Sequence, residues 1–224
     1  MSTIQTKGYP KGFTEYQILF RRKIYPGAMG LHPNTKRPTI FANRLRVARQ
    51  FDGLKLLGYT ENTEAGYEGL MRVFLAYTAL EKLGDVLLAP SSRKSIGRIA
   101  LRDKCSLYAH DSVLKSLNVN DPKGRFVEHV AKHCKSSQLK ARIGGLLSED
   151  PPSIAILANG IRNLFAHGHL TPSPQNCDPT CVAKLCEQIS RFVIHVLDEE
   201  FSSVIVRYCE KSGIDYESLA KSSS

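Results

Sequence analysis

The sequence predicts an all-α protein built as a bundle of four to six helices. Several stretches repeat apolar residues at the three- and four-residue intervals of an amphipathic helix, and no stretch shows a convincing strand-like alternation. Glycine and proline separate these stretches. The expected organisation is a basic, partly irregular extension that includes the first helix over 1–58, a helical bundle over 59–212 and a tail over 213–224.

The composition favours a folded chain without a membrane span. Of the 224 residues, 42% are hydrophobic and 23% are charged, which favours a packed core and excludes global disorder. The chain has no run of about 18 apolar residues and no signal-peptide pattern at its N-terminus, so we expect a cytoplasmic protein. The six cysteines are then expected to be reduced thiols rather than disulfides.

The first half of the chain contains one irregular segment and two strong helical patterns. Glycines and prolines interrupt residues 1–37. The first expected helix covers 39–57 and ends at Gly58, and the longest apolar stripe predicts a helix over 63–88 that ends before Pro90. Residues 91–117 are more polar and predict one or two helices with a bend.

The second half predicts three further helices, over 121–134, 151–167 and 181–211. Asp121 is placed to cap the first of them with Pro122 in its first position, and Ser153 is placed to cap the second. Gly168 is the expected stop of that second helix, and the proline-rich segment after it is an expected loop. The stretch 136–147 is short, and Gly144-Gly145 breaks it.

The net charge of +10 is concentrated in the first quarter of the chain. Residues 1–58 hold 11 lysines and arginines against two acids, leaving 20 bases and 19 acids in the rest. A one-sided basic segment favours contact with a polyanion, first of all RNA; the alternative is a solvated basic surface without a partner. The cations expected to bind RNA are Arg21, Arg22, Lys23, Arg44, Arg46 and Arg49.

Residues 159–172, NGIRNLFAHGHLTP, place Arg162, Asn163 and His167 on the last turns of an apolar helix. One interpretation is structural: Arg162 extends to solvent, and His167 is a cation that the helix C-terminus favours. The other is catalytic. An arginine holds phosphate, a histidine transfers protons near neutral pH and an amide orients the substrate. Together these groups suit metal-free cleavage of RNA by its 2′-hydroxyl.

The spacing of these residues favours a dimer. Residues five apart on an ideal helix differ by about 140° around its axis, so Arg162 and His167 do not point the same way. One imidazole also cannot easily act as base and acid at once. Two copies of the helix across a two-fold axis would relieve both problems, so the catalytic interpretation predicts a homodimer.

The stretch RNLFAH resembles the Arg-polar-x3-His motif of HEPN-domain proteins. The context is similar too, because the motif ends a penultimate helix, a polar loop follows and a long helix closes the chain. AYTALEKLGD resembles an earlier helix of that family, in which Glu81 stands for its acidic residue. The resemblance covers about residues 60–211 and leaves 1–58 and 91–150 unaccounted for by a minimal bundle.

The resemblance implies a dimerising bundle and a metal-independent endoribonuclease in a toxin–antitoxin, phage-defence or RNA-processing system. It implies Arg162, Asn163 and His167 as the catalytic set, with Glu81 supporting, and no cofactor. His169, close to the motif in sequence, is a second supporting candidate. A protein antitoxin or regulator is a further implied partner. Some family members are catalytically silent and bind ligands or act as scaffolds, so a module that binds nucleic acid or a partner protein is the alternative.

A metal site is the competing chemical interpretation. His129 and His133 lie one helical turn apart beside Cys134, and three cysteines lie near one another further along the chain. No CxxC pair occurs, and Cys134, Cys186 and Cys209 fit apolar faces, so we expect no metal. His169 is expected at the edge of the motif cleft or in solvent. In the metal interpretation, the three cysteines near one another in sequence are Cys177, Cys181 and Cys186.

Overall fold

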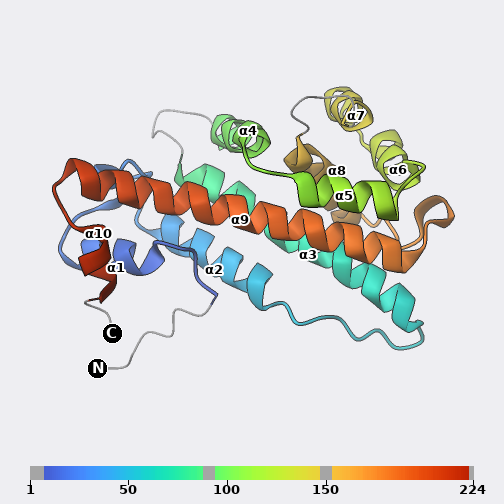
Figure 1. Ribbon diagram of the computed structural model, residues 1–224, viewed down its shortest axis with the longest axis horizontal. Coiled ribbons are helices and arrows are strands. Elements are labelled where there is room, and N and C mark those ends of the chain that lie inside the picture. Colours follow the sequence, from blue (N-terminus) through green and yellow to red (C-terminus); the bar gives the residue numbers. More distant parts are fainter. Residues whose placement is uncertain (1–7, 88–93, 147–152, 222–224) are drawn as a thin grey trace. The chain divides into compact units, whose positions relative to one another are not determined.

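The structure is a computed structural model that describes residues 8–87, 94–146 and 153–221. These residues form α-helices and short 3₁₀ turns and no strand, which confirms the all-α prediction. The described part of the chain contains ten α-helices (Figure 1) rather than the four to six expected. The difference arises because six of the helices are only six to eleven residues long: α1, α4, α5, α6, α7 and α10.

The chain divides into two compact units. The first, here called the terminal unit, comprises Met1–Gln50, Ala79–Leu101 and Ile194–Ser224. The second, here called the motif unit, comprises Phe51–Thr78 and Arg102–Val193. Helices α3 (Glu61–Val86), α4 (Lys94–Lys104) and α9 (Pro179–Lys211) contribute residues to both units. None of the helices in the described ranges has the length and apolar character needed to cross a membrane.

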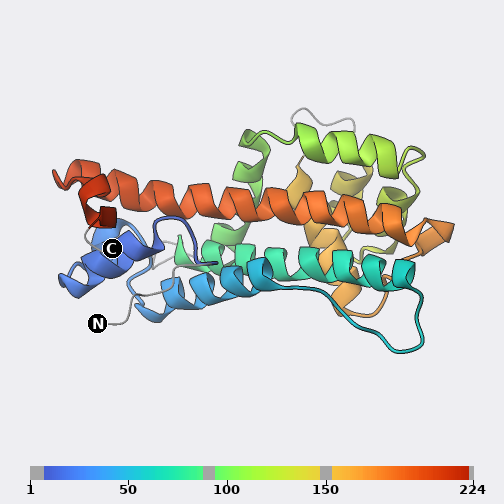
Figure 2. The ribbon, with the colours of Figure 1, turned by 60° about the horizontal axis from the view of Figure 1, so that its bottom comes forward.

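An aromatic cluster forms the core of the terminal unit. The ring of Phe201 on α9 lies 5.3 Å from that of Phe41 on α2 (Lys36–Gln50) and 6.3 Å from that of Phe13 on α1 (Phe13–Arg21). Helix α1 also packs against α10 (Tyr216–Lys221), and Figure 2 shows both beside the last part of α9. The basic segment is therefore packed within this unit, together with the 3₁₀ turn η1 (Pro26–Met29).

One expected helix end is wrong, and the expected C-terminal tail contains a further helix. Helix α2 ends at Gln50 instead of continuing to 57, because Gly53 has a φ of 119°, which no right-handed helix accepts. The expected C-terminal tail contains α10, where Leu219 is buried and the carboxylate of Asp215 accepts a hydrogen bond from the amide of Glu217. Burial of one apolar residue and a capping carboxylate account for this short helix.

The longer predicted helices are confirmed. Helix α3 matches the expected range 63–88, whose last residue and Pro90 lie outside the described residues. Helix α9 matches the expected range 181–211. The expected bend within 91–117 is the 3₁₀ turn η2 (Cys105–Leu107), which joins α4 to α5 (Asp111–Asn120).

Three helices of the motif unit form the frame of the candidate site: α6 (Arg125–His133), α7 (Ser137–Gly144) and α8 (Ile154–Ala166). Asp121 caps α6 as expected, because its carboxylate accepts hydrogen bonds from the backbone amides of Phe126 and Val127, both at 3.1 Å. The N-cap position itself belongs to Gly124, so Pro122 precedes the helix instead of opening it. Ser153 does occupy the N-cap of α8, although its side chain accepts no capping hydrogen bond.

Helices α6 and α7 both pack against α8, and Gly160 marks their closest approach. A Cβ added to Gly160 would lie 2.7 Å from Cγ1 of Val130 on α6 and 2.5 Å from Cδ1 of Ile143 on α7. Both of these side chains are fully buried. The α8 backbone therefore comes into direct contact with two neighbouring helices at a point where any side chain would separate them.

Gly160→Ala is expected to lower the free energy of unfolding by about 1–3 kcal/mol, because the new methyl group overpacks a closed core. Urea denaturation followed by circular dichroism measures this loss. Gly144→Ala is the matched control: Gly144 is the last residue of α7, and a Cβ there meets no atom within 4 Å. The control is expected to be as stable as wild type or slightly more stable. Equal losses in both variants would contradict the packing account.

Candidate functional site

The motif helix ends in a glycine-dependent turn, as the sequence predicts. His167 is the C-cap of α8, and Gly168 follows it with a φ of 69°. The amide of His169 donates to the carbonyl of Leu164 at 2.8 Å, and that of Gly168 donates to Phe165 at 3.1 Å. These are the paired bonds of a Schellman turn, in which the left-handed residue is usually glycine. The turn places His167 and His169 on either side of the same chain reversal.

A cleft of about 260 Å³ lies at this end of α8, where the α6–α7 connection meets it. Its side chains bring three imidazoles, one ammonium group and one carboxamide together, and none of the residues described along its wall is acidic. The histidines and Lys135 are solvent-exposed, so a large substrate can reach them. The lining residues are His133, Cys134, Lys135, Ser136, Leu139, Asn163, Leu164, His167 and His169.

Two of the cleft imidazoles lie near one another, and the backbone fixes one nitrogen of the third. The ring centroids of His167 and His169 are 6.5 Å apart. Nδ1 of His133 lies 2.9 Å from the carbonyl oxygen of His129. Because a carbonyl only accepts, Nδ1 of His133 carries the proton of this bond, and Nε2 is the nitrogen available for proton exchange.

His129 on α6 lies beside the cleft, with its ring 4.1 Å from that of His133. Burial lowers the pKa of His129, and the neighbouring His133 and Lys132 lower it further, whereas the backbone of His169 opposes the shift. His129 is therefore neutral beside the exposed imidazole of His133.

Arg162 does not line the cleft. Its Nη1 donates to Oδ1 of Asn163 at 2.8 Å, and Nδ2 of Asn163 donates to Oδ1 of Asn159 at 3.2 Å. The expected phosphate clamp is thus engaged, within this chain, in fixing the carboxamide that does line the cleft. Asn163, His167 and His169 are brought together as expected, and Arg162 contacts them through Asn163.

Glu81, the expected supporting acid, belongs to the terminal unit, whereas the motif belongs to the other unit. Its Oε1 lies 3.5 Å from Nη1 of Arg98. The same guanidinium donates to both carboxylate oxygens of Asp85, each at 3.1 Å. Glu81 is therefore part of an ion-pair network that joins α3 to α4 within the terminal unit.

The six cations expected to bind RNA also lie in the terminal unit, and the structure divides them. The guanidinium of Arg46 lies 5.0 Å from the ring centroid of Tyr9, and that of Arg49 bonds to the carbonyl of Tyr9 and pairs with Asp198. These two arginines hold the N-terminal segment in place. The other four are exposed to solvent: Arg21, Arg22, Lys23 and Arg44.

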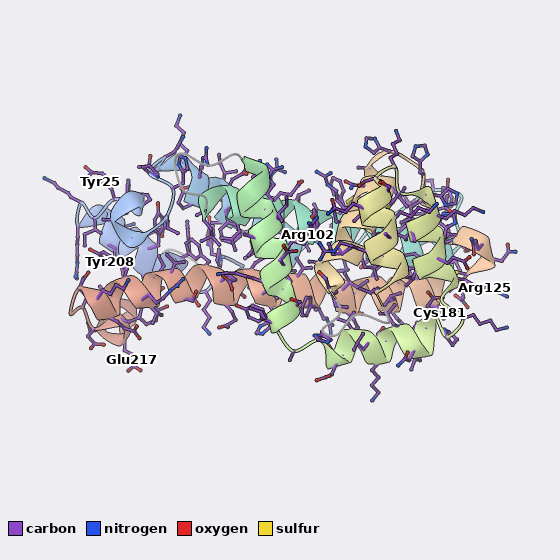
Figure 3. All side chains as sticks on the ribbon, turned by 90° about the horizontal axis from the view of Figure 1, so that it is seen from above. Tyr25, Arg102, Arg125, Cys181, Tyr208 and Glu217 are labelled. Carbon is purple, nitrogen blue, oxygen red and sulfur yellow. The ribbon has the colours of Figure 1, made fainter. Side chains whose placement is uncertain are left out.

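The described residues contain no group of three or more histidines, cysteines or acids placed to hold a metal ion. All six cysteines are free thiols, and burial raises the pKa of Cys134 and Cys186. Burial and Asp121 also raise the pKa of Cys177, whereas Arg125 lowers it. Figure 3 shows Arg125 and Cys181 at the same end of the motif unit.

Half of the cleft was not expected from the sequence. The spacing of His129 and His133 is visible in the sequence, but there it suggests only a competing metal pair and not a wall of this cleft. No local sequence pattern predicts the place of Lys135, Ser136 and Leu139 in the cleft. They come near the motif only because the chain turns between α6 and α7. Residues 94–146, part of the stretch that a minimal bundle leaves unaccounted for, thus supply one wall of the site.

Comparison with known proteins adds no relative: no family model, curated protein or solved structure matches the chain. The resemblance of RNLFAH to the HEPN motif therefore rests on the residues and their context.

His129→Gln is expected to make stability less sensitive to acid. The pKa of folded His129 lies below the ordinary value of 6.5, so the unfolded chain takes up the proton first. Stability from this residue is complete above that value and falls as the pH drops from it towards the lower folded pKa. We therefore expect the variant to lose less stability than wild type between about pH 7.5 and about pH 5.5 in urea denaturation.

Comparing the two pH values within each protein removes any constant packing cost of the substitution. Glutamine keeps a polar group but does not titrate. An acid-induced loss as large in His129→Gln as in wild type would show that the burial of this imidazole does not affect folding.

Proposed function

We propose that this protein is a metal-independent endoribonuclease of the HEPN type that cuts RNA at the cleft beside the end of α8. The observation that carries the proposal is the gathering of His133, His167 and His169 with Lys135 and Asn163 around one opening of about 260 Å³. Proton donors, proton acceptors and a positive charge are what attack by a 2′-hydroxyl requires. The exposure of these groups suits a polymeric substrate.

In the proposed reaction, His167 removes the proton of a ribose 2′-hydroxyl. The 2′-oxygen forms a bond to the adjacent phosphorus as the bond from phosphorus to the 5′-oxygen breaks. A protonated His133 or His169 gives its proton to that leaving oxygen. The products are a 2′,3′-cyclic phosphate and a 5′-hydroxyl, so the step needs no oxidant, reductant or water.

The arrangement offers an acid and a base within a single chain. His167 and His169, 6.5 Å apart between ring centroids, are close enough to contact one phosphate group by hydrogen bonds of about 2.9 Å. The Nδ1 bond of His133 leaves its Nε2 for proton transfer. Lys135 supplies the charge that stabilises the phosphorane, and Asn163, oriented by Arg162, bonds to the substrate.

The homodimer expected from the motif remains part of the proposal. A second copy would add another set of imidazoles and another Arg162 to a composite cleft. The proposed setting, whether a toxin–antitoxin pair, phage defence or RNA processing, follows from the motif resemblance, as does a protein antitoxin or regulator. Within one chain, Arg162 is a positioning residue, because its contact to the cleft passes through Asn163.

One observation favours the second function, a catalytically silent module that binds nucleic acid or a partner protein. Arg162 is engaged with Asn163, whereas a catalytic arginine would be free to meet the phosphate from the cleft wall. In such a module His167 would have no chemical task. Replacing it would then leave both RNA affinity and biological effect intact.

His167→Ala is expected to reduce RNA cleavage by at least about 100-fold, because it removes the general base. Wild-type protein and variant are incubated with mixed cellular RNA in EDTA, and the fragments are separated on denaturing gels. Single variants of His133 and His169 then identify the acid: the one that supplies the proton loses a comparable factor.

His195→Ala is the matched control, since His195 is an exposed histidine of the terminal unit that does not line the cleft. It is expected to cut RNA at the wild-type rate. Cleavage that survives in His167→Ala, or that EDTA abolishes, would contradict the proposed mechanism. RNA binding without cleavage by any of these proteins would favour the silent module.

A further inference from the structure

A second opening, of about 200 Å³, lies in the terminal unit between α1 and the start of α2. We call it the aromatic groove. Three aromatic rings, one arginine, one carboxamide and two hydroxyl groups line it. The lining residues are Phe13, Tyr16, Gln17, Phe20, Arg21, Thr35 and Thr39.

The aromatic rings continue from the core to the surface. Phe20 stacks on Tyr16 with centroids 6.2 Å apart, and Tyr25 meets the edge of Phe20 at 5.9 Å. Phe20 is 37% exposed and Tyr25 is 58% exposed, so both offer ring surface to solvent. Figure 3 shows Tyr25 in the loop beyond α1. Exposed rings anchored by buried ones form a rigid stacking surface.

Positive charge follows the exposed ring of Phe20 in the sequence. From residue 16 to residue 51 the chain has eight lysines and arginines and no acid. Arg21, Arg22 and Lys23 directly follow Phe20, and all three are exposed. Arg21 also lines the groove. A polyanion that lies along the groove would therefore meet cations beside each exposed ring.

Lys23 occupies a backbone position that favours glycine. Its φ is 64°, its amide donates to the carbonyl of Phe20, and the amide of Ile24 donates to that of Leu19, both at 3.0 Å. These bonds form a Schellman turn with Lys23 at the left-handed position. Local stability does not account for a lysine there. Its positive charge, three residues after Phe20 and two before Tyr25 in the sequence, is the property that a glycine would lack.

We propose that the aromatic groove, together with the exposed ring of Tyr25 that lies beside Phe20, binds single-stranded nucleic acid. Bases stack on Tyr25 and Phe20, and Arg21, Arg22 and Lys23 neutralise the phosphates. A duplex keeps its bases stacked on one another, so only an unpaired strand can use these rings. The inference rests on the proposed function only in naming unpaired RNA as the substrate class. The groove itself also fits unpaired DNA, which shares the same chemistry.

The test is fluorescence anisotropy with the full chain carrying His167→Ala, in EDTA, so that cleavage does not consume the probe. The probes are a labelled oligouridylate of about 12 nucleotides, the corresponding oligothymidylate, and the oligouridylate annealed to its complement. Tyr25→Ala is expected to weaken binding of the single strands at least about fivefold, and Tyr25→Phe, which keeps the ring, by less than about twofold.

Tyr59→Ala is the matched control. Tyr59 is 55% exposed and meets the edge of Tyr67 at 5.8 Å, as Tyr25 meets Phe20, but it belongs to the motif unit. It is expected to leave affinity unchanged. Lys23→Gly adds a variant that relieves the backbone, so its weaker binding and its shallower salt dependence would not come from unfolding.

Equal effects of Tyr25→Ala and Tyr59→Ala, or tighter binding of the duplex than of the single strands, would overturn the inference. Binding of both single strands, or of the RNA strand alone, supports it and identifies which sugar the groove accepts. The two proposals fail separately. If the protein binds unpaired RNA through Tyr25 but never cuts it, the groove proposal is supported and the nuclease proposal is contradicted. If RNA is cut and Tyr25→Ala changes neither binding nor cleavage, the nuclease proposal is supported and the groove proposal is contradicted.

Discussion

The close contact of α6 and α7 with α8 at Gly160 is the constraint on which the candidate site depends. Val130 and Ile143 touch the α8 backbone because Gly160 has no side chain. This contact brings the α6–α7 turn, with His133 and Lys135, to the end of the motif helix. The cleft is thus a product of packing between segments about 30 residues apart, and the motif alone provides only one of its walls.

The cleft changes how the motif is understood. A single RNLFAH helix supplies one arginine and one imidazole at an unfavourable angle, which is why the sequence favours a dimer. Packing supplies further imidazoles and an ammonium group from the same chain, so proton transfer in both directions is proposed without a second copy. Arg162 then acts through Asn163, whose carboxamide it orients. We propose further contacts with RNA at the exposed cations and rings of the terminal unit.

The sequence predicts those parts of the molecule that depend on local periodicity. Helices α3, α8 and α9 and the stop at Gly168 follow from apolar spacing and from one left-handed glycine. The partner of Glu81 could not be predicted, because tertiary packing of α3 against α4 brings the guanidinium of Arg98 to its carboxylate. The early end of α2 and the short α10 depend on single backbone and burial effects that periodicity does not register.

The most direct test of the central claim is the chemical nature of the ends that the protein leaves on RNA. A synthetic RNA of defined sequence is incubated with the full chain in EDTA, and the fragments are weighed by mass spectrometry. Attack by the 2′-hydroxyl predicts a 2′,3′-cyclic phosphate, or the monophosphate formed when it hydrolyses, on one fragment and a 5′-hydroxyl on the next. Fragments with 3′-hydroxyl and 5′-phosphate ends, or RNA that stays intact while bound, would contradict the account.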